Sequence, residues 1–455
     1  MSSNLLLQFR VLGIRRRLER SCHWTSEELA VHRRAQLAQT LRFARETSAF
    51  YARFHRGMEN RPLEELPILT KQTMMENFDD LITDRSVRLA DVDAWLKQDD
   101  GAGLFRNRYV ALATSGSTGQ RGVFLYSPAE WIECLASISR PMKWAGVKPN
   151  PLRPLRSTML ASTTPWHYSA RVGRSLSTRM LPTLRLDAGE PVESMVRRLN
   201  EWRPNVLVAY PSVLRQLADE QIAGRLRIAP SFCATSAEVL TPETRRRIGE
   251  AWGVRVFETY GATEYAPIAA ECAAGRRHLF DDGAIIENVD RRGNAVPAGE
   301  LGDRVLLTVF NRRTQPLIRY EISDMIRISG ERCGCGRPFR CLEEIEGRQE
   351  DVLYLSGIPV HPNVFHRVLE TVPAAAWQVI QDETGLTVNL TGLRDAAVRD
   401  RLAAEVRDLL EAEGVAAPPI RVETVTELKR GKTGKAPLIM GLPRTGLLRT
   451  GKAGA

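Results

Sequence analysis

The sequence predicts an α/β protein with a large N-terminal domain of several sheets and a smaller C-terminal α+β domain. Three observations lead to this prediction. The chain has 455 residues, which is too long for one ordinary domain of about 100–200 residues. Short apolar strand patterns alternate with helical patterns between residues 109 and 260. Residues 352–440 then place one helical pattern between strand patterns, as in a small α+β domain of roughly 90 residues.

The individual elements follow from apolar periodicity and from capping residues. Residues 25–55 open on Thr-Ser-Glu-Glu and carry apolar residues at helical spacing, which predicts one or two amphipathic helices. Strands are expected at 109–114, 205–210, 254–260 and 304–310, and residues 347–355 are expected to lead into another strand. Helices are expected at 191–202 and 242–252. In the C-terminal part, strands are expected at 386–390 and 420–423, and a helix at 395–413. The expected domains are therefore 1–349 and 350–440, followed by a basic tail at 441–455.

Composition limits the class of function. Hydrophobic residues make up 43% and charged residues 26%, as in a globular enzyme. The net charge of +10 comes from the two ends, because residues 10–20 hold five arginines and one glutamate, and residues 428–455 hold seven basic residues and no acid. The rest of the chain is nearly neutral, which argues against a basic groove that binds nucleic acid. No transmembrane stretch or signal peptide is expected, so the predicted location is cytoplasmic, with no membrane partner.

A loop rich in glycine and hydroxyl residues follows the strand at 109–114. Residues 113–122 read Ala-Thr-Ser-Gly-Ser-Thr-Gly-Gln-Arg-Gly. Backbone N–H groups and hydroxyls in such a loop can bind phosphate oxygens, although serine and glycine also dominate ordinary turns. The loop lacks the Gly-Lys-Ser/Thr ending of a P-loop, so an ordinary P-loop NTPase is disfavoured.

Four further segments have side chains suited to a nucleotide. Residues 257–264, Phe-Glu-Thr-Tyr-Gly-Ala-Thr-Glu, follow a strand, offering an aromatic ring for a base, a hydroxyl for phosphate and a carboxylate for magnesium. Asp324 ends the segment 320–324 and could accept ribose hydroxyls. The other two segments are Gly-Arg-Gln-Glu-Asp at 347–351 and the basic segment 429–437, which includes Lys435.

In this order and spacing, the segments resemble the adenylate-forming superfamily of acyl-CoA synthetases, luciferases and peptide-synthetase adenylation domains. Within it the chain is similar to the phenylacetate-CoA ligase-like branch, especially to the adenylate-forming enzymes related to a synthetase that adenylylates a deazaflavin coenzyme. The segments 66–71, 165–170, 209–213 and 315–320 carry this resemblance. It implies ATP- and magnesium-dependent conversion of a carboxylic acid to its acyl-AMP, then transfer of the acyl group to a thiol, with coenzyme A expected. It also implies a C-terminal domain that rotates between the two half-reactions.

The resemblance assigns a role to each matching residue. The ATP phosphates would be held by the loop residues Thr114, Ser115, Gly116, Ser117, Thr118 and Gly119. Tyr260 and Gly261 would contact adenine, Thr263 the phosphate, Glu264 magnesium, Asp324 the ribose and Arg348 the nucleotide. Lys435 would stabilise charge on the α-phosphate, with Lys432 as its rival. Two positions depart from the family pattern, because Glu350 replaces the usual hinge aspartate and Arg121 stands in for the usual lysine of the phosphate loop.

Three cysteines and one histidine form a candidate metal site. Cys272, His278, Cys333 and Cys335 make a Cys₃His set, which tetrahedral zinc prefers. Their spacing is not that of a zinc finger, so spacing alone favours ordinary loop cysteines over a metal site. The resemblance favours a structural zinc, because some phenylacetate-CoA ligase-like proteins hold zinc at these places. Cys341 is a spare candidate.

His167 and Tyr210 are the expected acyl-pocket residues, although aromatic residues here could equally belong to the core. The resemblance places His167 where related enzymes have a gate beside that pocket. Other acceptors stay open: an amine, a carrier-protein thiol, or a hydroxyl that receives AMP. A non-catalytic protein that binds nucleotide or nucleic acid through its basic ends is the remaining alternative.

Overall fold

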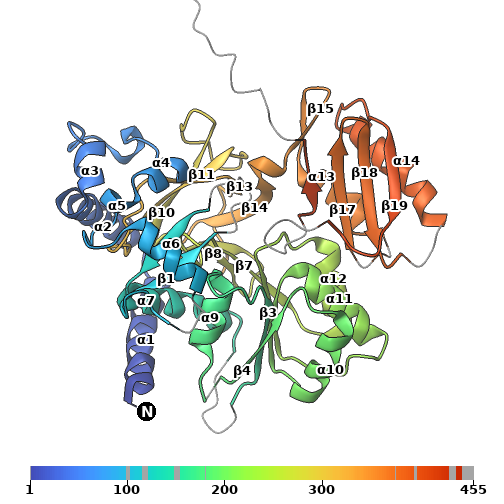
Figure 1. Cartoon of the computed structure of the whole chain (residues 1–455), viewed down its shortest axis with the longest axis horizontal. Coiled ribbons are helices and arrows are strands. Elements are labelled where there is room, and N and C mark those ends of the chain that lie inside the picture. The colour runs from blue at the N-terminus through green and yellow to red at the C-terminus, as the bar shows by residue number, and fades with distance from the viewer. Residues whose placement is uncertain are drawn as a thin grey trace, which may run out of the picture. The chain divides into compact units, whose positions relative to one another are not determined.

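The computed structural model describes residues 2–98, 103–114, 121–147, 154–179, 181–372, 374, 376–393, 397–429 and 437–442. The chain divides into two compact units, residues 1–345 and 346–455; the sequence predicts a boundary at residue 350. The first unit combines helices with parallel and antiparallel strands, which confirms the α/β class (Figure 1). Within the described part of the chain, no helix has both the length and the apolar character needed to span a membrane.

The first unit opens with a helical region: α1 (Ser2–Ser21), α2 (Ser26–Thr47), α3 (Ala49–Phe54), the 3-10 turn η1 (Leu63–Glu65), α4 (Lys71–Glu76), α5 (Phe78–Leu81) and α6 (Leu89–Gln98). The start of α2 is the expected capping box. The Glu28 N–H donates to Thr25 Oγ1 at 3.1 Å, and the Thr25 N–H donates to Glu28 Oε2 at 2.7 Å. This satisfies two backbone donors that a helix N-terminus otherwise leaves unpaired.

Tyr51 ties this helical region to the middle of the chain. Its side chain is fully buried in the main core of the first unit. The Tyr51 hydroxyl donates to the Pro316 carbonyl at 3.1 Å and accepts from the Ile318 N–H at 3.1 Å. Helix α3 is therefore joined by side-chain hydrogen bonds to the segment that leads into β12 (Tyr320–Ile322).

The main sheet has nine strands in the order β13-β14-β9-β8-β7-β6-β5-β3-β4. Its members are β3 (Ser157–Ala161), β4 (Thr183–Asp187), β5 (Val206–Ala209), β6 (Phe232–Ser236), β7 (Val256–Tyr260), β8 (Ala269–Glu271), β9 (Arg277–Leu279), β13 (Asp324–Ile328) and β14 (Cys341–Arg348). Strands β4, β3, β5, β6 and β7 are parallel. Their connections contain α9 (Tyr168–Leu176), α10 (Val192–Trp202), α11 (Pro211–Ile222) and α12 (Pro242–Trp252), of which α10, α11 and α12 lie together in Figure 1.

Two smaller antiparallel sheets complete the first unit. Strands β1 (Val110–Ala113) and β2 (Val123–Tyr126) pair with each other, and the predicted phosphate loop connects them. The second sheet has β10 (Ala284–Val289), β11 (Arg304–Val309) and β12. Helices α7 (Pro128–Ile138) and α8 (Arg140–Trp144) follow β2.

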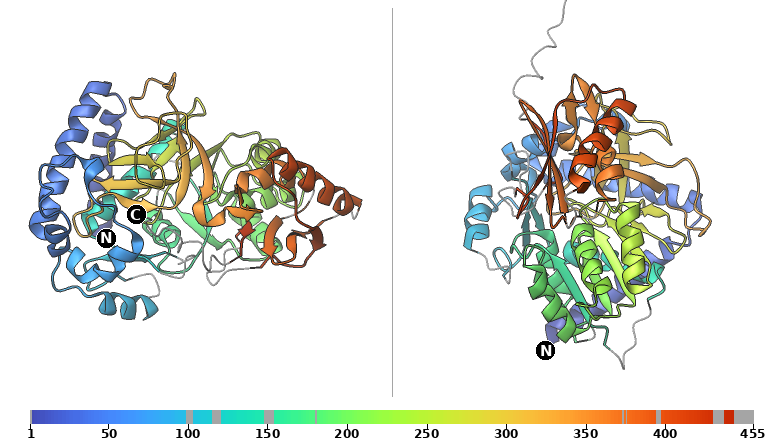
Figure 2. Two further views of the ribbon diagram at one scale, coloured as in Figure 1. Left: turned by 90° about the horizontal axis from the view of Figure 1, so that it is seen from above. Right: turned by 90° about the vertical axis from the view of Figure 1, so that its right-hand side faces the viewer.

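The second unit is the expected α+β fold. It contains the turn η2 (Gln349–Asp351), the hairpin β15 (Leu353–Leu355) and β16 (Ile358–Val360), and helices α13 (Pro362–Leu369) and α14 (Ala397–Ala412). Its sheet has the order β19-β18-β17-β20, formed by β17 (Ala376–Asp382), β18 (Gly385–Thr391), β19 (Ile420–Thr424) and β20 (Ile439–Met440). Trp377 and Val379 point into the core with residues of both helices, which cover one face of this sheet (Figure 2). Because side chains alternate along a strand, Gln378 belongs to the opposite face.

Candidate active site

Several of the residues selected from the sequence lie where parallel strands end. Strand β7 ends at Tyr260, and Tyr210 follows β5. In open α/β sheets, ligands bind at the carboxyl ends of the strands. Tyr260 and Tyr210 therefore lie at the same edge of the main sheet.

Tyr260 and Asp324 meet directly. The Tyr260 hydroxyl donates to Asp324 Oδ2 at 2.7 Å, and each residue is only 8% exposed. Asp324 opens β13, whereas Tyr260 closes β7, so the contact joins two strands that are not neighbours in the sheet. A short hydrogen bond to a carboxylate is among the stronger ones in proteins. It fixes both the tyrosine ring and the carboxylate that the sequence predicts for adenine and ribose.

We expect Asp324→Ala to raise the apparent KM for ATP about tenfold or more, because hydrogen bonds to charged groups contribute about 1.5–3 kcal/mol. Tyr260→Phe should raise it less, since the ring remains and only the orienting hydroxyl is lost. Tyr109→Phe is a matched control, because the Tyr109 hydroxyl donates to Asp84 Oδ2 at 2.8 Å elsewhere in the unit. Initial rates over a range of ATP concentrations test this; an unchanged KM for Asp324→Ala would contradict the assignment.

Two buried tyrosines hold the segment around Glu264. The Tyr320 hydroxyl donates to Glu264 Oε1 at 3.3 Å, and Glu264 is 7% exposed. Burial and the neighbouring Glu264 charge raise the pKa of Tyr320 well above its usual value, so this hydroxyl keeps its proton. On the backbone side, the Tyr126 hydroxyl donates to the carbonyls of Thr263 at 2.6 Å and Glu264 at 3.2 Å. Sequence reasoning assigned no role to either tyrosine; Tyr320 stands in a family segment, but Tyr126 only ends an apolar strand.

The ends of the predicted phosphate loop are closely held. The Thr114 N–H donates to the Gly122 carbonyl at 2.8 Å, and the Gly122 N–H donates to Thr114 Oγ1 at 2.8 Å. A Cβ atom at position 122 would lie 3.0 Å from the Phe124 ring and 3.2 Å from Thr114 Oγ1, so this turn favours glycine. The Arg121 guanidinium lies over the Trp166 ring, 4.8 Å from its centroid. Ser115, Gly116, Ser117, Thr118 and Gly119 lie outside the described residues.

The two predicted acyl-pocket residues converge on Ser162. His167 Nδ1 lies 2.6 Å from Ser162 Oγ, and the Ser162 N–H donates to the Tyr210 hydroxyl at 3.1 Å. His167 is buried, and burial raises the pKa of Tyr210. Ser162 was missed from the sequence because a serine after a strand is a common loop residue. Ser162 thus contacts His167 through its side chain and Tyr210 through its backbone N–H, so the three residues form one polar cluster at the ends of β3 and β5.

Four other residues singled out from the sequence belong to the second unit. Arg348 is exposed and is the last residue of β14, and Glu350 lies in η2. Lys432 and Lys435 lie outside the described residues. The roles assigned to these four residues remain predictions.

The four predicted metal ligands come together in the first unit. Their ligand atoms all lie within 4.8 Å of one another. Cys272 Sγ is 3.8 Å from Cys333 Sγ, and Cys335 Sγ is 3.2 Å from His278 Nε2. Strands β8 and β9 bring the first pair of ligands close, because Cys272 follows β8 and His278 lies in β9.

The histidine of this cluster has the tautomer that a metal ligand needs. His278 Nδ1 lies 3.3 Å from the Phe339 carbonyl, which can only accept, so Nδ1 carries the proton. Burial lowers the pKa of His278 to about 4, so the ring is neutral near pH 7. The Nε2 lone pair is then directed toward the cysteines. Cys341 pairs with His278 across β14 and β9 but is not among the four clustered residues.

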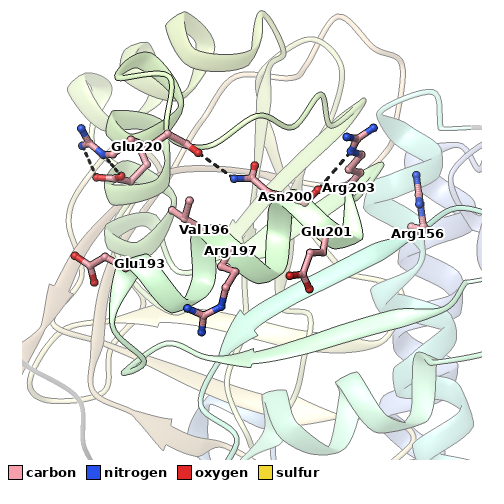
Figure 3. A pocket seen from close by; sticks show the side chains of 9 residues that line it. Arg156, Glu193, Val196, Arg197, Asn200, Glu201, Arg203 and Glu220 are labelled. Carbon is pink, nitrogen blue, oxygen red and sulfur yellow. Dashed lines mark hydrogen bonds and ion pairs between the residues drawn. The ribbon is translucent and has the colours of Figure 1, made fainter.

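A large open groove of about 1090 Å³ lies elsewhere (Figure 3). Its lining includes Arg156, which precedes β3, and Arg203, which ends α10 before β5, so it lies at the amino-terminal ends of these strands. Glu220 pairs with Arg225 at 2.7 Å in this lining. Because α/β sheets bind ligands at the opposite strand ends, the groove is not part of the candidate site.

Comparisons with known proteins identify the family and the fold of this chain. The family described as AMP-binding enzyme matches residues 64–303. A phenylacetate-coenzyme A ligase of Thermus thermophilus is 26% identical to this chain, over 57% of this chain and 59% of the ligase. A phenylacetate-coenzyme A ligase of Pseudomonas putida is 29% identical, over 43% of this chain and 44% of that ligase. The chain thus spans about half the length of these curated relatives. A 2-hydroxyisobutyryl-CoA ligase, solved with an acyl-AMP, has a TM-score of 0.74 at 18% identity over 93% of this chain and 91% of its own. At this identity the likeness shows the shared fold.

Proposed function

Because the chain belongs to the AMP-binding enzyme family, we propose that it activates a carboxylic acid as an acyl-AMP and transfers the acyl group to the thiol of coenzyme A. The contact between Tyr260 and Asp324 is the observation that carries this proposal. It joins the two side chains expected to bind adenine and ribose, at the strand ends where Thr263 and Glu264 follow. The names of the relatives, which are coenzyme A ligases, support the second half-reaction.

The first half-reaction needs charge stabilisation rather than a general base. A carboxylate oxygen of the acid forms a bond to the α-phosphorus of ATP, the bond between the α-phosphorus and the bridging oxygen breaks, and pyrophosphate leaves. No proton moves, because the acid is already ionised. Two anions must approach each other, so positioned cations and donors supply most of the catalysis. Lys435 is the proposed cation at the α-phosphate, and Arg121 supplies positive charge beside the phosphate loop.

In the second half-reaction the sulfur of coenzyme A bonds to the acyl carbonyl carbon, and the bond to the AMP oxygen breaks. The thiol proton is released, and AMP leaves as the anion. His167, Ser162 and Tyr210 form the polar cluster that we propose lies beside the acyl group. The fixed position of these side chains would orient the acid and limit its size.

Glu264 is the proposed ligand of magnesium. A carboxylate that is 7% exposed and already oriented by Tyr320 is a suitable oxygen donor for this hard cation. Magnesium, when bound, would neutralise charge on the phosphates. We expect Glu264→Gln to shift the half-saturating magnesium concentration upward about tenfold in adenylation assays, since the charged ligand is lost. Glu321→Gln is the control, because Glu321 binds Arg304 outside this segment. An unchanged magnesium titration would remove Glu264 from the metal site.

We also propose that Cys272, His278, Cys333 and Cys335 hold a structural zinc. Three thiols and one imidazole within 4.8 Å match the ligand types and number of a closed tetrahedral site. The Phe339 carbonyl orients the imidazole, as is usual for the non-coordinating nitrogen of a metal-bound histidine. A four-ligand shell leaves no open position for a substrate, so the metal would act by stabilising the fold.

The experiment that tests the function is ATP–pyrophosphate exchange with a panel of aryl and short aliphatic acids. One or more acids should drive exchange, and coenzyme A should then convert that acid to a thioester. If exchange occurs but coenzyme A does not react, the acceptor is an amine, a carrier-protein thiol or a hydroxyl that receives AMP, and each can be supplied in turn. If no acid drives ATP–pyrophosphate exchange and the protein binds DNA in a salt-sensitive way, the non-catalytic alternative is supported.

A further inference from the structure

Gln378 is a buried amide whose partners come from two separate points of the chain. It lies in β17 and is 0% exposed. Its Nε2 donates to the Lys429 carbonyl at 2.9 Å and to the Pro437 carbonyl at 2.7 Å. Its Oε1 accepts from the Lys429 N–H at 3.1 Å. A glutamine amide has only two N–H donors, so both are used for these two carbonyls.

The two partner residues flank the segment that carries the candidate catalytic lysines. Lys429 is the last described residue before segment 430–436, and Pro437 is the first after it. The Pro437 end continues into β20, where the Val379 N–H donates to the Leu438 carbonyl at 2.7 Å. The Lys429 end is joined to the Pro437 end through the single side chain of Gln378. Lys435 stands two positions before Pro437 in the sequence.

Gln378 lies on the face of the sheet that the helices of this unit do not cover. Its strand neighbours Trp377 and Val379 point into the core with α13 and α14. Opposite Gln378 in the antiparallel register is Asn389, a second buried amide. A fully buried amide on this face needs hydrogen-bond partners, because an unpaired buried amide is destabilising. The carbonyls of Lys429 and Pro437 meet that need.

We propose that Gln378 is a positioning residue for adenylation: by binding both Lys429 and Pro437, it fixes the separation of the two residues that flank segment 430–436, in which Lys435 stands. This inference rests on the proposed role of Lys435. One side chain that binds both ends fixes their separation, which neither end could do alone. Gln378 touches no substrate in this scheme and acts only through the lysine segment.

The first test compares the two half-reactions in Gln378→Glu and Gln378→Met. Glutamate keeps the length and the acceptor but has no N–H to donate, and methionine fills the space without adding a charge. We expect both to lower the rate of ATP–pyrophosphate exchange about tenfold or more, with the KM for ATP changed less than about threefold, because lost positioning affects the transition state most. The rate of thioester formation from preformed acyl-AMP should stay within about twofold, as expected for a step that does not use the lysine.

Gln381→Glu is the matched control. Gln381 lies on the same strand and donates a single hydrogen bond to the Tyr354 carbonyl at 3.1 Å. The same chemical change at this position should leave both half-reactions unchanged. If the Gln378 variants lose both half-reactions equally, or if Gln381→Glu reproduces their effect, Gln378 only stabilises the fold and the inference is wrong.

A double-mutant cycle with Lys435→Ala separates this inference from the proposed function. If Gln378 acts through Lys435, adding Gln378→Met to Lys435→Ala should cause no further loss of adenylation, because coupled residues are non-additive. A further loss equal to that of the single variant would overturn the inference. If Lys435→Ala alone leaves adenylation intact, the proposed role of Lys435 fails, and the inference that rests on it fails with it. A loss with Lys435→Ala but none with Gln378→Met would overturn the inference only.

Discussion

Replacement of Lys435 by alanine is expected to slow adenylation by at least about a hundredfold, because one preorganised charge contact to the transition state is typically worth that much. The loss should appear in ATP–pyrophosphate exchange with saturating ATP and acid. Transfer from preformed acyl-AMP should suffer less, since the α-phosphate no longer gains charge from an attacking carboxylate in that step. Equal loss in both half-reactions would contradict the role.

Lys432 provides the matched control for this experiment. It belongs to the same basic segment and differs from Lys435 by position alone. Lys432→Ala should therefore lower adenylation only mildly. If Lys432→Ala lowers adenylation more than Lys435→Ala does, Lys432 rather than Lys435 stabilises charge on the α-phosphate.

Replacement of Cys333 by serine is expected to abolish zinc binding and to lower the thermal stability of the first unit. Native protein purified without added metal should contain about one zinc per chain, with sulfur ligands at roughly 2.3 Å. Loss of a structural metal removes binding free energy that contributes to folding. A loss of about 2–3 kcal/mol would lower Tm by roughly 3–4 °C, because an unfolding entropy of about 2.1 cal/mol/K per residue gives about 1.4 °C per kcal/mol for a unit of 345 residues.

Cys341→Ser is the control for the zinc experiment. Cys341 is also buried and pairs with His278 across two strands, but it lies outside the four-residue cluster. This variant should keep its zinc. ATP–pyrophosphate exchange per folded molecule should be similar in the native protein and in Cys333→Ser. Native protein that contains no zinc after elemental analysis would show that the four side chains are ordinary buried residues.

The elements with strong local patterns were predictable from the sequence. Helices α10 and α12 begin and end within one residue of the expected positions, and β18 and β19 also match closely. In each case, apolar periodicity and the flanking turn residues agree with the final fold. Helix α1 was missed because its arginines suggested only a solvated end. Its C-terminal part is instead bound by Arg140, which donates to the Leu18 carbonyl at 2.9 Å and pairs with Asp282 at 2.7 Å.

The sequence motifs suggested individual residues of the candidate site, but they did not predict the contacts between residues from distant segments. The sequence suggested Tyr260 and Asp324 separately, but not that the tyrosine hydroxyl would bind the carboxylate. Strands β8 and β9 are three residues each, too short for periodicity, yet they bring Cys272 and His278 together. Tyr126 lacked any signal because its partners Thr263 and Glu264 lie far along the chain, and Ser162 lacked one because a serine after a strand is a common loop residue.

Tyr51 bears on how the protein can be divided for expression. The family match begins at residue 64 and ends at residue 303, but the Tyr51 hydroxyl connects residues beyond both limits through its bonds to Pro316 and Ile318. A fragment trimmed to the matched residues would lose helices α2 and α3 and would leave the apolar partners of Tyr51 open to water. Such a fragment should aggregate. A useful truncation has to keep Tyr51 together with residues 316–318, so the residues matched by the family do not by themselves make up the compact first unit.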